Sequence, residues 1–323
     1  MAMPNSPWWQ DGNLTLAVTN GSLAQSRLDD MATRIIATWY KYAQLDDPGF
    51  GMPLDLNAPH EFVDARDLES AETILQGAIE GHVLLKNSNG ALPLQKPRFL
   101  SLFGYDGVAE LDNTDDGYKW LLGENNVDTV LGLGYFNETY AIDYISSAVS
   151  PYDPVPGISM NGTQISGGGS GSVTPSYIDA PYDAFVRQAR KDGTFLNWDF
   201  RNQNPVVNGA TEACIVFINA FASEGWERPN IADTYSDTLI QNVAAQCNNT
   251  HVVVHNAGVR LVDRWIDNPN ITSVIFAHVP GQDSGQALVD VMYGVQSPSG
   301  RLPYTVAKNE SDYGHLLLSL IHI

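Results

Sequence analysis

Short apolar runs that alternate with helix-forming segments constrain the fold of this 323-residue chain more than any other feature. The apolar runs lie at 83–87, 99–104, 213–219, 251–256 and 273–277. Helical patterns lie around them at 68–81, 182–191, 238–246 and 284–293. Because the runs lack strict apolar and polar alternation, each is expected to be a strand buried on both faces. The pattern predicts an α/β/α sandwich around a mostly parallel sheet, whose ligands meet the loops at the carboxyl ends of strands.

The first part of the chain has a different pattern. Apolar residues recur at helical spacing from Ser26 to about Gln44, which predicts a single amphipathic helix that cannot bury its own face. The segment that follows is rich in Asp, Pro and Gly, as linkers between domains are. We therefore predict the end of a larger domain at 1–45, a linker at 46–67, the sandwich at 68–308 and a truncated or non-native tail at 309–323.

Charge excludes several classes of partner. The chain has 17 basic and 37 acidic side chains, a net charge of −20, so nucleic acids and anionic membrane surfaces are not expected to bind. No apolar run approaches the roughly 18–20 residues that span a bilayer. The histidines lack metal-ligand spacing and no phosphate-binding loop motif is present, so we expect neither a metal nor another cofactor.

Cysteines and glycosylation signals bear on the compartment. Cys214 and Cys247 each lie just before or at the start of a predicted strand, where neighbouring strands could bring them within disulfide reach; two buried free thiols are the alternative. Seven Asn-x-Ser/Thr sequons are candidate surface glycan sites: Asn13, Asn20, Asn137, Asn161, Asn248, Asn270 and Asn309. We expect a secreted, extracellular protein, although the first residues lack the features of a signal peptide.

Glu224 is the most suggestive catalytic carboxylate. It follows the predicted strand at 213–219, where a loop would carry its side chain over the carboxyl edge of the sheet. Gly225 lets the backbone turn, and Trp226 offers an aromatic face to a sugar ring. An aromatic neighbour that excludes water would raise the pKa of an acid catalyst, whereas Arg228 would lower it. An ordinary solvated loop glutamate is the alternative.

In order along the chain stand VLLKNSNGALPL (83–94), INAFASEGW (218–226), VPGQDSG (279–285) and SPSGRLPYT (297–305). Together these segments resemble glycoside hydrolase family 3, in particular its fungal β-glucosidases. Residues 83–94 (VLLKNSNGALPL) are similar to the family's VLLKN…LPL signature, and 218–226 (INAFASEGW) to the stretch with its acid/base glutamate. Residues 279–285 (VPGQDSG) and 297–305 (SPSGRLPYT) are similar to its PGQESG and nPsGklP runs. The resemblance extends from Met1 to about Gly314 and implies the C-terminal α/β/α sandwich of that family.

The resemblance also implies roles for individual residues. Glu224 becomes the general acid/base, and Trp226 falls where an aromatic residue often contributes to the aglycone subsite. Residues 1–45 resemble the close of the family's (β/α)8 barrel, with Trp8 and Trp9 in a loop that often lines the same subsite. The family's nucleophile is an aspartate in an S-D-W type motif of that barrel, and no such motif occurs in this sequence.

The expected activity is retaining hydrolysis of β-glucosides and cello-oligosaccharides, with this chain supplying only the acid/base domain. Without the barrel as a partner, the chain by itself is expected to be inactive. A β-xylosidase, an exo-glucanase, a catalytically silent carbohydrate-binding module and a nucleotide-binding domain are the alternatives.

Overall fold

The computed structural model describes residues 11–42, 66–109, 157–160, 162–167, 175–222, 228 and 230–314. The chain divides into two compact units, Met1–Asp55 and Leu56–Ile323. The first unit contains the helices α1 (Asn13–Thr19) and α2 (Gln25–Lys41), and neither has a buried residue. The sequence predicted the second helix but not the first. The domain boundaries drawn from the sequence stay predictions.

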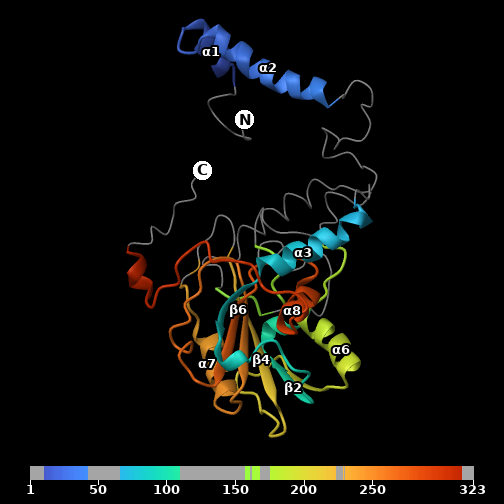
Figure 1. Ribbon diagram of the computed structural model, residues 1–323. Coiled ribbons are helices and arrows are strands. Elements are labelled where there is room, and N and C mark those ends of the chain that lie inside the picture. Colours follow the sequence, from blue (N-terminus) through green and yellow to red (C-terminus); the bar gives the residue numbers. More distant parts are fainter. Residues whose placement is uncertain are drawn as a thin grey trace, which may run out of the picture. The chain divides into compact units, whose positions relative to one another are not determined.

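The second unit is built on a six-stranded sheet (Figure 1). Its strands are β1 (Val83–Asn87), β2 (Phe99–Phe103), β3 (Phe195–Asp199), β4 (Ala213–Ala220), β5 (Thr250–Asn256) and β6 (Ile271–Phe276), in the order β1-β6-β5-β4-β2-β3. All neighbouring pairs are parallel except β1 with β6. The predicted mostly parallel sheet is thus confirmed.

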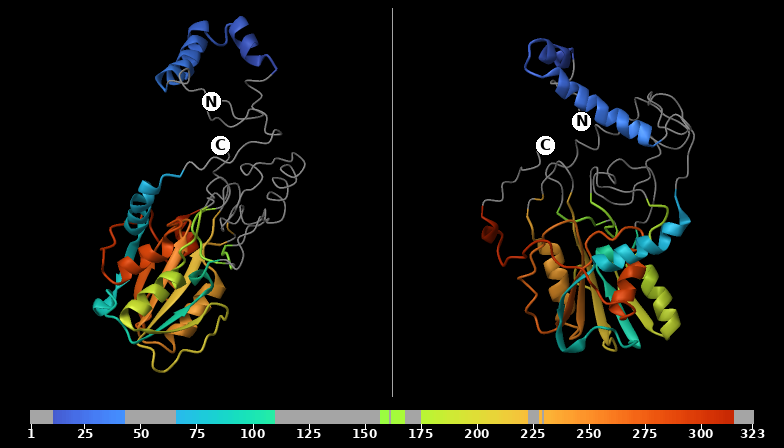
Figure 2. Two further views of the ribbon diagram at one scale, coloured as in Figure 1. Left: turned by 90° about the vertical axis from the view of Figure 1, so that its right-hand side faces the viewer. Right: turned by 45° about the horizontal axis from the view of Figure 1, so that its top comes forward.

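Helices cover both faces of this sheet (Figure 2). On one face α3 (Ala71–Gly81), α6 (Pro181–Asp192) and α8 (Ser284–Met292) pack against the sheet in one apolar core. On the other face α7 (Thr234–Ala244) forms a second core with side chains of β4, β5 and β6. The central strands β4 and β5 are buried along their whole length, which explains their continuous apolar sequence. Short 3-10 helices lie at Leu68–Ser70, Ser88–Gly90, Tyr105–Gly107 and Glu310–Tyr313.

Local chemistry sets the ends of two of these helices. Pro181 occupies the start of α6, where its missing N–H is no loss, and Gly193 ends the helix in the left-handed conformation. The sequence placed the start of α7 at Thr238, but the helix begins at Thr234. The reason is Asp233, whose side chain accepts a hydrogen bond from Ser236 N at 2.6 Å and caps the helix.

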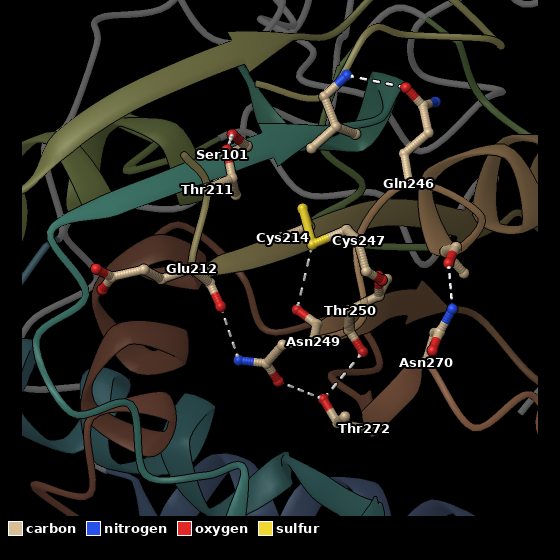
Figure 3. The surroundings of a disulfide bond; sticks show 12 residues. Ser101, Thr211, Glu212, Cys214, Gln246, Cys247, Asn249, Thr250, Asn270 and Thr272 are labelled. Carbon is tan, nitrogen blue, oxygen red and sulfur yellow. Dashed lines mark hydrogen bonds between the residues drawn. A yellow bond between two sulfur atoms is a disulfide. The ribbon is translucent and has the colours of Figure 1, made fainter. Parts of the chain in front are cut away.

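A disulfide joins Cys214 and Cys247 at the amino edge of the sheet (Figure 3). Cys214 is the second residue of β4, and Cys247 lies between α7 and β5. Asn249 ties the same edge together: its Nδ2 donates to Glu212 O at 3.2 Å, and its Oδ1 accepts from Thr272 Oγ1 at 2.7 Å. The start of β4, the start of β5 and β6 are thus fastened within one small region.

Replacing both cysteines with alanine is expected to lower the free energy of unfolding by about 2–4 kcal/mol, because the bond closes a loop of substantial length in the unfolded chain. The two cysteines are 33 residues apart in sequence. Urea unfolding of the wild-type chain with and without dithiothreitol measures the loss, and the double variant, which has no disulfide to reduce, is the control. An unchanged midpoint after reduction, with two free thiols titrated, would contradict this expectation.

Candidate active site

Polar side chains gather where the parallel strands end. The carboxyl ends of β2, β4, β5 and β6 lie at the same edge of the sheet, where α/β proteins place their ligands. Among the polar residues at this edge that are 0% exposed are Asp106, Asn219, His255 and Ser284. Because a buried polar group without a partner is costly, their hydrogen bonds decide how the edge is built.

Asn219 lies one residue before the end of β4 and uses its whole amide group. Its Oδ1 accepts from Ser159 N at 2.9 Å, and its Nδ2 donates to Ser159 O at 2.8 Å and to Asp106 Oδ1 at 2.9 Å. Phe221 N donates to Gly157 O at 3.0 Å just beyond the strand. The segment around Ser159 is therefore held against the end of β4.

Asp106 receives hydrogen bonds from several directions. It lies in the turn after β2, and its Oδ1 also accepts from Gln164 N at 2.8 Å. Its Oδ2 is bonded to His255 Nδ1, and His255 Nε2 is bonded to Ser284 Oγ at 3.0 Å. Burial raises the pKa of the Asp106 carboxyl, while His255 and the donors from Asn219 and Gln164 oppose that rise.

The sequence of carboxylate, imidazole and hydroxyl in this chain of contacts is also found in serine hydrolases. Here, however, Ser284 Oγ is enclosed, since Asp106, His255 and Ser284 are all 0% exposed. No substrate can reach a hydroxyl in that position. The arrangement therefore holds structure rather than providing a nucleophile.

A second set of contacts holds the chain at Arg228 and Ile231. Arg228 Nη2 donates to Val259 O at 2.8 Å, and burial lowers the pKa of this guanidinium, with the nearby charge of Arg260 acting in the same direction. Ile231 N donates to Glu310 Oε1 at 2.7 Å. The segment at 223–227 is thus preceded by an anchor at Asn219 and Phe221 and followed by one at Arg228 and Ile231.

A buried ion-pair cluster supports the second anchor. The guanidinium of Arg260 is nearly enclosed, and its Nη2 lies 2.8 Å from Asp237 Oδ1 and 3.0 Å from Asp233 Oδ2. Trp265 Nε1 donates to Asp237 Oδ1 at 2.9 Å. Since an unpaired charge in such a position is strongly destabilising, the cluster fixes the loop after β5 relative to α7.

A polar pocket of about 480 Å³ lies beside this anchor. Its lining carries both signs of charge: Asp233, Asp263 and Glu310 are acidic, and Arg264 and Lys308 are basic. This mixed lining favours no strongly charged ligand. Among the described residues that line it there is no aromatic side chain on which a sugar ring could stack.

The residues predicted to act on substrate lie outside the described part of the chain: Glu224, Trp226, Trp8 and Trp9. Their roles stay predictions. Within the described ranges no group of three or more His, Cys, Asp or Glu side chains could hold a metal ion. In the same ranges no helix is both long and apolar enough to cross a membrane.

The predicted sequons differ in their surroundings. Asn137 and Asn161 lie outside the described residues, whereas Asn13, Asn20, Asn248 and Asn309 are exposed. Asn270 is half-buried, and its Nδ2 donates to Ala244 O at 2.8 Å. Because a glycan is attached through this nitrogen, its attachment at Asn270 would compete with that contact and meet the packed end of α7.

The buried group of Asp106, Asn219, His255 and Ser284 was missed by sequence reasoning. A signal was present, because Asn219 and His255 are polar residues at the carboxyl ends of otherwise apolar runs. Asp106 follows such a run after one glycine and one tyrosine. A polar residue at that position in a buried strand needs a partner, and the partners are found at the same edge.

Comparison with known proteins identifies close similarities. A model of the glycosyl hydrolase family 3 C-terminal domain matches residues 82–319. A protein of Aspergillus fumigatus described as probable beta-glucosidase M is 49% identical over 320 residues, which are 98% of this chain and 37% of that protein. A beta-glucosidase of Pyricularia oryzae is 47% identical over 326 residues, which are 100% of this chain and 40% of that protein.

Solved structures give the same result for the fold. A family 3 beta-glucosidase of Neurospora crassa matches with a TM-score of 0.69 and 32% identity, over 94% of this chain and 35% of that one. The beta-D-glucoside glucohydrolase of Trichoderma reesei matches with a TM-score of 0.66 and 30% identity, over 94% of this chain and 38% of that one. The chain thus spans about two fifths of the length of the relatives that it matches.

Proposed function

The chain belongs to glycosyl hydrolase family 3, and we propose that it supplies the acid/base part of a retaining β-glucosidase, with Glu224 as the general acid and base. One observation carries this assignment: the described residues on both sides of 223–227 in sequence are held by hydrogen bonds, Asn219 with Phe221 before them and Arg228 with Ile231 after them. A catalytic group needs a backbone held in this way on both sides.

The proposed chemistry requires two carboxyl groups about 5–5.5 Å apart on either side of the glycosidic bond. One attacks the anomeric carbon, and Glu224 gives its proton to the departing oxygen. Glu224 then takes a proton from the water molecule that releases the sugar from the covalent intermediate. We assign the attacking aspartate to the part of the relatives that this chain does not span.

The substrate class follows from the similar proteins. Those of Aspergillus fumigatus and Pyricularia oryzae are both described as beta-glucosidases. We therefore propose β-glucosides, including cello-oligosaccharides, as substrates. Trp226, with Trp8 and Trp9, is proposed to contact the sugar that leaves.

We also propose that the protein is extracellular and glycosylated. Two observations support this, the disulfide between Cys214 and Cys247 and the exposure of Asn13, Asn20, Asn248 and Asn309 in their sequons. Asn270 is the described sequon that we expect to stay unmodified, because its Nδ2 donates to Ala244 O.

A joined protein tests the proposed activity. The N-terminal part of the Aspergillus fumigatus relative, up to the point where the similarity begins, is fused to this chain, and hydrolysis of p-nitrophenyl β-glucoside is measured. We expect turnover by the joined protein and none by this chain alone. The unaltered relative is the control for assay conditions. Turnover by this chain alone, or a folded joined protein without activity, would refute the proposal.

A further inference from the structure

The carboxyl edge contains one continuous chain of buried hydrogen bonds. It runs from Asn219 at the end of β4 through Asp106 after β2 and His255 at the end of β5 to Ser284, the first residue of α8. It thereby connects two strand ends, one turn and one helix. Tyr105 extends it, because its hydroxyl accepts from Asn219 N at 3.2 Å.

If Asp106 is a carboxylate and His255 carries a single ring proton, the donors and acceptors in this chain have one consistent assignment. Asp106 accepts at both oxygens, so His255 donates to it from Nδ1 and accepts at Nε2 from the hydroxyl of Ser284. Asn219 donates to Asp106 from Nδ2, which leaves its Oδ1 to accept from Ser159 N. Each member thus fixes the orientation of the next, and the carboxylate of Asp106 is the acceptor on which the donors converge.

Burying these polar side chains costs desolvation free energy that an apolar core would not require. Asp106, Asn219, His255 and Ser284 are 0% exposed, and apolar side chains of similar volume would fill the same space without desolvating a carboxylate. A satisfied polar network differs from apolar packing because it permits one geometry only. The network therefore fixes the exit direction of β4 more narrowly than packing alone would.

We propose that Asp106 is a positioning residue for the acid/base step, acting through Asn219 on the backbone that leads from β4 to Glu224. This inference rests on the proposed function of Glu224. Only four residues separate Asn219 from Glu224, and Asn219 is held at its side chain and at its backbone N–H. Asp106 itself is enclosed and does not contact substrate.

The test uses the joined protein with Asp106→Asn and Asn219→Ala as separate variants. Asp106→Asn keeps the shape but presents an amide N–H₂ to His255 Nδ1, so the imidazole must change tautomer. We expect kcat to fall about 10- to 100-fold in each variant, as small misplacements of a catalytic group do. KM is expected to change less than about threefold, because the lost interaction matters in the transition state.

Asn249→Ala is the matched control. Asn249 is also an amide that connects strand ends, to Glu212 and Thr272, but it does so at the amino edge. Its loss should lower the melting temperature and leave kcat unchanged at equal folded fraction. If Asn219→Ala and Asp106→Asn lower kcat no more than Asn249→Ala does, their role is merely structural and the inference is wrong.

Ser284→Ala keeps the test decisive if the other variants do not fold. It removes one hydroxyl at the far end of the network and leaves His255 Nε2 without its partner. We expect a fall in kcat of about 3- to 10-fold at unchanged KM, and an unchanged kcat would overturn the inference. The unsubstituted joined protein separates the two proposals. If it is inactive, the proposed function fails. If it is active but the substitutions in the network leave kcat unchanged, only this inference fails.

Discussion

Replacing Glu224 with glutamine in the joined protein is expected to lower kcat/KM for an alkyl β-glucoside by about 10²- to 10⁴-fold, the usual contribution of general acid/base catalysis. An alkoxide leaves poorly unless it receives a proton as the bond breaks. A dinitrophenolate leaves without that help, so the first step with dinitrophenyl β-glucoside is expected to survive. Pre-steady-state bursts of dinitrophenolate, followed by slow turnover, measure this difference.

Added azide provides the second readout for Glu224. Azide attacks the covalent intermediate without giving up a proton, so it replaces the water that Glu224 no longer activates. We expect azide to raise the turnover of dinitrophenyl β-glucoside by Glu224→Gln and to yield β-glucosyl azide. Glu212→Gln, at the amino edge, is the control for loss of one carboxylate. Glu227 is the next carboxylate along the sequence after Glu224. If Glu227→Gln shows both the loss and the azide rescue while Glu224→Gln does not, Glu224 is not the acid/base.

Exchanging Gly104 for alanine is expected to cost more than about 4 kcal/mol, enough to remove most of the stability of a typical domain. Gly104 follows β2 with a φ of 96°, a conformation that residues with a side chain rarely adopt. A Cβ there would also collide with the backbone carbonyl of Phe217 in β4. The atoms of Phe217 that the Cβ would meet belong to the backbone and not to a flexible side chain, so the strand or the turn would have to move.

Two other glycines separate the two causes of this loss. Gly193 has a φ of 77° and open space around the position of a Cβ, so Gly193→Ala is expected to cost only about 1–2 kcal/mol. Gly285 has no unusual φ, but its Cβ would collide with Ala180 O and lie 2.8 Å from Asp179 O, so we expect about 3 kcal/mol. Urea unfolding of all three variants measures the order, and Gly104→Ala no worse than Gly193→Ala would contradict it.

Four of the strands that the sequence predicted, β2, β4, β5 and β6, are buried over most of their length. β4 and β5 read as apolar runs because both of their faces are covered by helices. β3 was missed since it is an edge strand whose side chains are exposed or half-buried, with Asn197 and Asp199 among them. The antiparallel direction of β1 was likewise unpredictable, because pairing direction depends on the path of the chain and not on the five residues of the strand.

The carboxyl end of β4 could be predicted from the sequence, whereas the contacts made there could not. The end of β4 follows from the apolar run that precedes Glu224. The partnership of Asp106 with His255 does not, since the two residues are 149 positions apart and meet only because β2 and β5 end at the same edge. The separation of two residues in sequence does not reveal which strands lie close together in the sheet, and that arrangement decides this contact.

The disulfide and the buried hydrogen-bond network lie at opposite ends of the same strand, β4. Cys214 is near its beginning and Asn219 near its end. A support, dye or affinity tag fixed near Glu212 would therefore be attached on the side away from the proposed chemistry, with the covalent bond to reinforce the attachment. Immobilisation in that orientation leaves the carboxyl edge of the sheet facing the solution.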